Sequence, residues 1–223
     1  MVDWHGFWPP VLLSVRVAFV SSLIAWILGL WLGRWLSRKV FPGKALLETI
    51  FLLPLVLPPT VVGFILLKGL GRRSLLGQFA EWLFAKPIVF SWEAAVIASV
   101  VVSFPLVYQT MKIGFAGIDS CLEEAARSAG AGEWQVLRYI SLPLALPSLV
   151  SAYILGFARG LGEFGATLMI AGNIPGRTQT VPTAIYIAVD SGHTSMAWAW
   201  ALSMILLSFL LLSLTGRFAR PEG

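Results

Sequence analysis

Few residues of this 223-residue chain have the types and spacing that covalent chemistry needs. The GxGxxG pattern at residues 160–165 has the form of a dinucleotide-binding turn, but an apolar stretch precedes it where that turn requires a strand. Asp190, Ser191 and His193 stand too close in sequence to converge as a catalytic triad. No GxxxxGK[ST] phosphate loop occurs, and the single cysteine, Cys121, excludes an internal disulfide and a cysteine-based metal site. The sequence therefore predicts a protein that is not an enzyme and has no cofactor or metal of its own.

A charged island, rich in alanine and glycine, interrupts the apolar sequence. Residues 123–143, EEAARSAGAGEWQVLRYISLP, carry five charged side chains. Good helix formers occupy 122–128, and Gly130 is expected to end or turn that helix. Ala125 and Ala126 give it a face without bulk, which another protein can approach to backbone distance. The charged residues would orient that contact: Glu123, Glu124, Arg127 and Glu133. A solvated loop helix is the alternative, although such a helix gains little from small side chains.

The rest of the chain must position these residues, and it has the composition of a membrane protein. It is 57% hydrophobic and 12% charged, with a mean hydropathy of +0.82. A spanning helix needs roughly 20 mostly apolar residues. Five stretches qualify: 11–33, 46–67, 92–111, 142–161 and 196–214. The sequence predicts an all-α integral membrane protein with about five transmembrane helices, in a single transmembrane domain over residues 1–223. The charged island then lies in a connecting loop at about residues 119–140.

Charges and prolines within the expected spans call for separate explanations. Arg159 and Glu163 are four residues apart on one helix face, and a buried charge is costly unless it is paired. We expect an intrahelical ion pair that faces the bundle or a wet cavity, with structural and functional roles equally open. Pro54, Pro58 and Pro59 fall within one span, and each removes a backbone donor. They predict a bent helix that lines a path through the membrane, with a purely structural kink as the alternative.

The basic residues indicate the orientation of the spans. Nine belong to the first–second and third–fourth connections and the tail: Arg34, Arg38, Lys39, Lys44, Lys112, Arg127, Arg138, Arg217 and Arg220. Five belong to the opposite side: Lys68, Arg72, Arg73, Lys86 and Arg177. Because cytoplasmic loops carry the excess of positive charge, we expect the N-terminus outside, and the island and C-terminus in the cytoplasm. Charges distributed in this way do not form a nucleic-acid-binding face. Arg16, near the start of the first span, can extend toward the interface.

The charged island resembles a known family signature. Glu124-Ala125-Ala126, Gly130 and Ile140-Ser141-Leu142-Pro143 match the EAA-x3-G-x9-I-x-L-P loop of ABC importer permeases in full. Residues 41–67 and 172–186 further resemble the molybdate-type permease subunit, and tungstate and sulfate permeases are similar in the same places. The resemblance implies a type I importer fold in which a short coupling helix docks on a separate ATPase subunit. It adds Ile140, Leu142 and Pro143 to the residues expected at that contact.

The resemblance also implies partners and a function. We expect an inner-membrane permease subunit that acts as a homodimer with two ABC ATPase copies, which bind the ATP, and with an extracytoplasmic oxyanion-binding protein. The expected function is ATP-driven import of an oxyanion, molybdate first and tungstate or sulfate as alternatives. The candidate path or gate residues remain Pro54, Pro58, Pro59, Arg159 and Glu163. An ion-coupled secondary transporter is the alternative from another class, and it would usually contain internal repeats, which are not evident.

Overall fold

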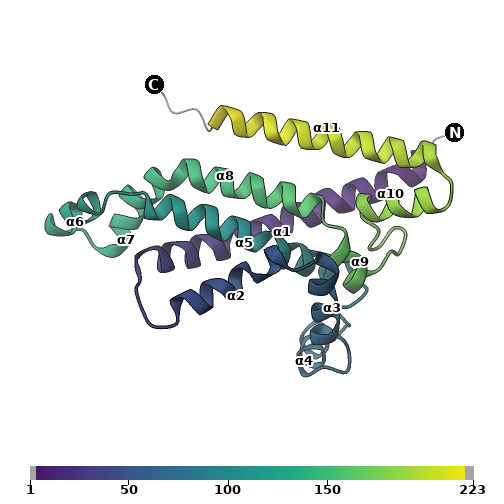
Figure 1. Ribbon diagram of the computed structural model, residues 1–223, viewed down its shortest axis with the longest axis horizontal. Helices are drawn as coiled ribbons and strands as arrows, with labels where there is room; N and C mark the ends of the chain where they lie inside the picture. Colours follow the sequence, from purple (N-terminus) through teal and green to yellow (C-terminus); the bar gives the residue numbers. More distant parts are fainter. Residues whose placement is uncertain (1–3, 219–223) are drawn as a thin grey trace.

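The computed structural model describes residues 4–218, and all regular structure in that range is helical. Four long helices lie side by side in Figure 1: α1 (Trp4–Arg38), α5 (Trp92–Ala116), α8 (Leu142–Leu161) and α11 (Thr194–Phe218). Each contains a segment long and apolar enough to cross a membrane, and a bent helix pair brings the possible spans to five. The predicted all-α architecture of about five spans is confirmed. Residues 1–3 and 219–223 of the predicted domain, including Arg220, lie outside the described residues.

Short helices gather at the two ends of this bundle. One end carries α6 (Ser120–Ser128) and α7 (Glu133–Val136), and the other carries α10 (Val181–Asp190). We refer to them as the α6 end and the α10 end. The α6 end holds three members of the larger predicted basic group: Arg34, Arg38 and Arg127.

The range predicted for the second span contains two helices rather than one bent helix. α2 (Lys44–Val56) and α3 (Pro59–Leu70) meet at an angle of 113°. A residue that precedes proline is forced out of the helical region. The break consists of Leu57 and Pro58, and each of them is followed by a proline. Leu57 has φ −68° and ψ 142°, and Pro58 has φ −53° and ψ 134°. Pro54, by contrast, lies inside α2 without ending it.

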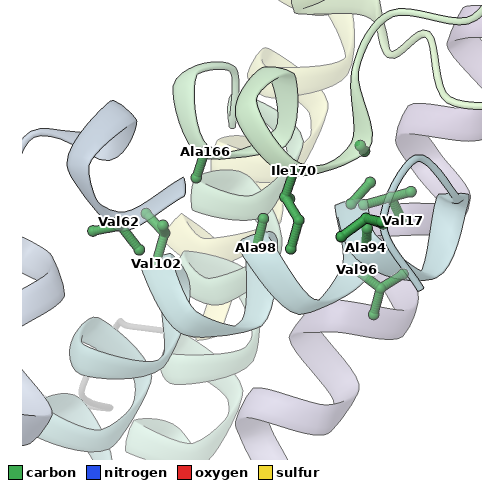
Figure 2. Close-up of a cluster of buried hydrophobic side chains, with 11 residues drawn as sticks. Val17, Val62, Ala94, Val96, Ala98, Val102, Ala166 and Ile170 are labelled. Atoms are coloured by element: carbon green, nitrogen blue, oxygen red, sulfur yellow. The ribbon is translucent and has the colours of Figure 1, made fainter. Parts of the chain in front are cut away.

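After the break, α3 turns away from the long helices and packs against α9 (Gly165–Ala171) (Figure 1). Figure 2 shows Val62 of α3 and Ile170 of α9 in a cluster of buried side chains that also includes Ala98 of α5. The approach is close because Gly63 has no side chain. A β-carbon at Gly63 would lie 2.7 Å from the Cα of Ala166. The direction of α3 is therefore fixed by packing as well as by the prolines.

The fourth span begins earlier than the predicted range 142–161. A π-helical turn, Leu137–Ser141, joins α7 to α8, so that the helix is continuous from Glu133 to Leu161. In this turn the Leu142 N–H donates to the Leu137 carbonyl, five residues back. The wider turn suits Pro143, which cannot donate to the carbonyl four residues before it. The second half of the charged island is thus the first part of a membrane helix rather than a loop.

The contact between α3 and α9 can be tested at Gly63. Gly63→Val should destabilise the protein by about 1–3 kcal/mol, because the added side chain has no space beside Ala166. Gly69→Ala, in the same helix, is the matched control, since a β-carbon there meets nothing within 4 Å. The measurement is thermal unfolding of the purified protein in detergent. Equal melting temperatures for the two variants would contradict the close approach.

Candidate functional site

The charged island folds into a short helix with defined ends. The Asp119 carboxylate accepts the Cys121 N–H at 2.9 Å and caps the start of α6. At the other end the Gly130 N–H donates to Arg127 and the Ala131 N–H to Ala126, which is the Schellman pattern. This pattern needs a left-handed residue, and Gly130 has φ +91°. The helix predicted over 122–128 and its end at Gly130 are confirmed.

Glu123 faces the interior of the molecule. Its side chain is 3% exposed, and its carboxylate accepts a hydrogen bond from the Ser141 hydroxyl at 2.7 Å. Three guanidinium groups surround the same carboxylate: Arg34 at 3.2 Å, Arg38 at 3.4 Å and Arg127 at 3.7 Å. A buried carboxylate needs such partners, because desolvation otherwise costs several kcal/mol. Glu123 therefore joins α6 to the end of α1 and to the π-helical turn. Sequence reasoning placed it on the docking face.

Other parts of the island remain open to solvent. Glu124 and Ala125 are exposed, and a hollow of about 360 Å³ lies at the end of α6. Its walls are mostly small or short side chains and include Ala126, Ala129, Gly130, Ala131, Gln135, Tyr139 and Ile140. We call this feature the coupling hollow. Because its walls carry little bulk, it can accept a side chain that projects from another protein.

The remaining predicted coupling residues lie around the hollow rather than in it. Arg127 donates to the Glu133 carboxylate from Nε at 2.5 Å and from Nη2 at 3.2 Å, which joins α6 to the first turn of α7. Leu142 is half-buried and Pro143 is exposed at the start of α8. The structure thus brings Ala126, Gly130 and Ile140 to one hollow, and the other predicted coupling residues lie outside its lining.

The predicted pair in the fourth span is present. Arg159 donates to Glu163 at 2.8 Å, and the second carboxylate oxygen of Glu163 accepts the Ala166 N–H at 2.9 Å. The side chain of Glu163 is 2% exposed, whereas that of Arg159 is 31% exposed. The ion pair is confirmed, but it is not intrahelical: α8 ends at Leu161, so Arg159 lies in its last turn and Glu163 in the connection to α9. The pair therefore joins the end of α8 to the first turn of α9. A role for this pair in gating stays a prediction.

The predicted path residues lie near the same junction. Pro58 and Pro59 are exposed and Pro54 is half-buried. A β-carbon at Gly165, two residues after Glu163, would lie 3.1 Å from the Cβ of Pro59. The break between α2 and α3 therefore adjoins the turn between α8 and α9, although the two segments are far apart in sequence.

Sequence reasoning missed the partners of two carboxylates. Arg34 and Arg38 were assigned to topology alone, although their spacing of four residues places them on one helix face. Glu48 of α2 is the second of these carboxylates. It pairs with Lys112 of α5 at 2.7 Å and accepts the Tyr108 hydroxyl at 3.3 Å. These partners are 60 or more residues from Glu48, so no spacing rule could have found them.

Comparison with known families decides the identity of the fold. The sequence pattern of the family described as "Binding-protein-dependent transport system inner membrane component" matches residues 25–221. The chain belongs to this family. The inner-membrane components of binding-protein-dependent transport systems are permeases, so the helices described above are those of a multi-pass permease subunit.

Relatives and solved structures agree with this assignment. The putative molybdenum transport system permease protein YvgM of Bacillus subtilis is 57% identical over 92% of this chain and 91% of its own length. The molybdenum transport system permease protein ModB of Escherichia coli K12 is 42% identical over 97% of this chain and 96% of its own length. Among solved structures, a bacterial alginate ABC importer superposes with a TM-score of 0.75 at 14% identity, over 98% of this chain and 82% of that chain. The MetNI methionine ABC transporter superposes with a TM-score of 0.71 at 19% identity, over 96% of this chain and 96% of that chain. These two likenesses show the type I importer fold of the permease.

The Arg159–Glu163 pair can be tested by its removal. Arg159→Ala should destabilise the permease by roughly 1–3 kcal/mol, less than a fully buried pair, because Arg159 is partly exposed and Glu163 keeps one backbone donor. The double variant Arg159→Met with Glu163→Gln should recover much of this loss, since it leaves no unpaired charge and a glutamine still accepts from Ala166. Thermal unfolding in detergent measures both. A double variant less stable than Arg159→Ala would contradict a compensating pair.

Proposed function

We propose that this permease subunit imports molybdate, driven by ATP that a separate subunit hydrolyses. The choice of molybdate as the substrate rests on the 57% identity to a protein named as a putative molybdenum permease, over 92% of the chain. The sulfate permease CysT of Escherichia coli is 33% identical over 98% of the chain, so sulfate is the alternative cargo, together with tungstate. The permease itself performs no catalysis and binds no cofactor.

The coupling hollow is the proposed contact with an ABC ATPase. The chain has no phosphate loop of its own, so ATP hydrolysis must occur on a partner. The hollow offers small walls for a projecting side chain of that partner, and Glu124, on the helix that leads to it, is exposed. In this proposal two permease copies form one pathway, each docked on one ATPase copy.

Movement at the hollow reaches the middle of the permease through continuous structure. Tyr139 and Ile140, in its wall, belong to the helix that runs from Glu133 to Leu161. This helix ends at the Arg159–Glu163 pair, beside α9 and the break between α2 and α3. ATP and the loaded binding protein drive alternating access only if each favours one conformation over the other. The pathway itself should bind its cargo weakly, because a conduit must release it. Specificity then lies mainly in the binding protein.

The proposed orientation places the α6 end in the cytoplasm, where ATP is available, and the N-terminus outside. The excess of basic residues in the segments of that end supports this orientation. An extracytoplasmic oxyanion-binding protein then delivers its cargo at the α10 end, and the C-terminus is cytoplasmic. The rival secondary transporter predicts uptake into liposomes that contain this chain alone. Uptake that requires both the ATPase and ATP separates the two hypotheses.

Substitutions at the coupling hollow test the proposed contact. Glu124→Lys should abolish ATP-dependent molybdate uptake in membrane vesicles while insertion into the membrane stays intact, because the exposed charge is reversed at the docking surface. Gly130→Val should do the same, because a β-branched residue at φ +91° distorts the helix end. Gly130→Asn is the matched control, since asparagine tolerates this conformation. Normal uptake by Glu124→Lys and Gly130→Val, with the ATPase still retained on purification, would refute the contact.

Labelling of Cys121 tests the orientation. This thiol is exposed at the start of α6, so a membrane-impermeant maleimide should modify it only from the cytoplasmic side, in membranes without the ATPase. The hydrogen bond to Asp119, and then the charge of that carboxylate, raise the pKa of the thiol above its usual value. Less thiolate is therefore present at neutral pH, and labelling should accelerate as the pH rises. Asp119→Asn, which keeps the helix cap, should accelerate labelling at neutral pH. Modification only from the outside would invert the topology.

A further inference from the structure

A second polar cavity lies at the α10 end, far along the bundle from the coupling hollow. Its volume is about 730 Å³. Four parts of the chain form it: α1, the α3–α4 connection, the segment between α4 (Leu75–Phe84) and α5 together with the first turn of α5, and the α9–α10 connection. These elements can be followed in Figure 1. Each contributes one cationic side chain, namely Arg16, Arg72, Lys86 and Arg177. We call this feature the basic cavity.

The charge of the basic cavity is not balanced from within the chain. Lys86 pairs with Glu93, which is the one carboxylate in the lining. In the part of the chain that the structure describes, no carboxylate forms an ion pair with Arg16, Arg72 or Arg177. Apolar walls next to uncompensated cations strengthen the local positive potential and raise the local concentration of anions. By contrast, the carboxylates of Glu48, Glu123 and Glu163 all pair with cations of the chain.

The walls of the basic cavity are held in place. The Arg16 guanidinium lies 4.2 Å from the centre of the Trp92 ring, which restricts its orientation. The buried Thr178 hydroxyl accepts the Ile174 N–H at 2.9 Å and closes the loop that carries Arg177. The Phe90 N–H donates to the Ile170 carbonyl at 2.9 Å and joins the segment before α5 to α9. The Arg16 guanidinium, the loop that carries Arg177 and the segment that follows Lys86 are thus each held by a defined contact.

We propose that the basic cavity is a receiving site for a tetrahedral oxyanion of the molybdate and sulfate class, at the end where the binding protein releases its cargo. The proposal rests on the proposed function and locates the first contact of the cargo with the permease. Guanidinium groups bind the oxygens of such anions through paired N–H donors. The volume is within the usual range for small-molecule sites, and it accommodates a hydrated anion but no folded partner. Exposure of Arg72 and Arg177 to solvent keeps the binding weak, so that the anion can leave.

Chemical protection of arginine tests the site directly. The permease–ATPase complex, in phosphatidylcholine nanodiscs without nucleotide or binding protein, is treated with phenylglyoxal, and modified arginines are quantified by mass spectrometry. Sodium molybdate should slow modification of Arg72 and Arg177 several-fold relative to sodium chloride at equal ionic strength. Arg73 is the internal control, because it is exposed next to Arg72 but does not line the cavity. No protection, or equal protection of Arg73, would overturn the proposal.

Two further arms separate the cargo from other anions. In nanodiscs that contain phosphatidylglycerol, added molybdate should still protect Arg72 and Arg177. Full protection by that lipid alone, with no further effect of molybdate, would assign the cavity to a lipid headgroup and overturn the proposal. In the reconstituted transporter, the double variant Arg72→Gln with Arg177→Gln should reduce the maximal uptake rate several-fold, whereas Arg73→Gln leaves it unchanged. The affinity of the loaded binding protein for the variant complex should stay constant. A matching loss of that affinity would make the cavity a protein-docking surface and overturn the proposal.

The same preparations distinguish failure of this proposal from failure of the proposed function. If the wild-type complex imports molybdate with ATP but molybdate protects no arginine, only the receiving site is refuted. If the wild-type complex imports none of molybdate, tungstate and sulfate, the proposed function is refuted whatever the protection shows.

Discussion

The buried carboxylate of Glu123 is the interaction on which the rest of the structure depends. A desolvated carboxylate is stable only with its partners in place, and here the partners come from three elements: Arg34 and Arg38 from α1, Arg127 from α6 itself, and Ser141 from the π-helical turn. This cluster fixes the position of α6, and the coupling hollow lies at the C-terminal end of the same helix. The helix from Glu133 to Leu161 then continues to the Arg159–Glu163 pair, and the Gly63 contact joins α9 to α3. Packed helices and paired side chains therefore connect α6 continuously to the break between α2 and α3.

The distribution of charge divides the molecule into two functional ends. Glu48 and Glu163 resemble Glu123 in that each joins two parts of the chain through a cation and a further donor. Inside an apolar bundle such pairs give specific positions to helices that would otherwise slide against one another, because an unpaired charge is the costly alternative. At the α10 end, by contrast, no carboxylate among the described residues forms an ion pair with the three arginines of the basic cavity, where Glu93 pairs with Lys86. In the proposed mechanism the ion pairs hold helices together so that they move as one, and the arginines of the basic cavity bind the anion.

Local signals in the sequence predicted local structure well. Apolar length identified α1, α5, α8 and α11, the spacing of Arg159 and Glu163 identified their pairing, and Gly130 marked the end of α6 through its backbone conformation. Features that depend on distant residues could not be obtained in this way. Glu123 points inward because Arg34, Arg38 and Ser141 meet around it. The angle of 113° between α2 and α3 has two causes: two prolines break the helix, and Gly63 lets α3 pack closely against α9. The helical continuity of α7 and α8 across Pro143 depends on a π-helical turn, for which the sequence offers no reliable pattern.

The most direct test of this account is the number of ATP molecules hydrolysed per molybdate imported by the Glu123→Gln transporter, reconstituted with its ATPase and binding protein. Glutamine keeps the acceptor for Ser141 but removes the charge that holds the three arginines, while Glu124 and the hollow remain outside the substitution. The account predicts that the complex still assembles and hydrolyses ATP, but consumes several times more ATP for each molybdate, because α6 no longer moves as one body with α1 and α8. A ratio equal to that of the wild-type transporter would contradict it.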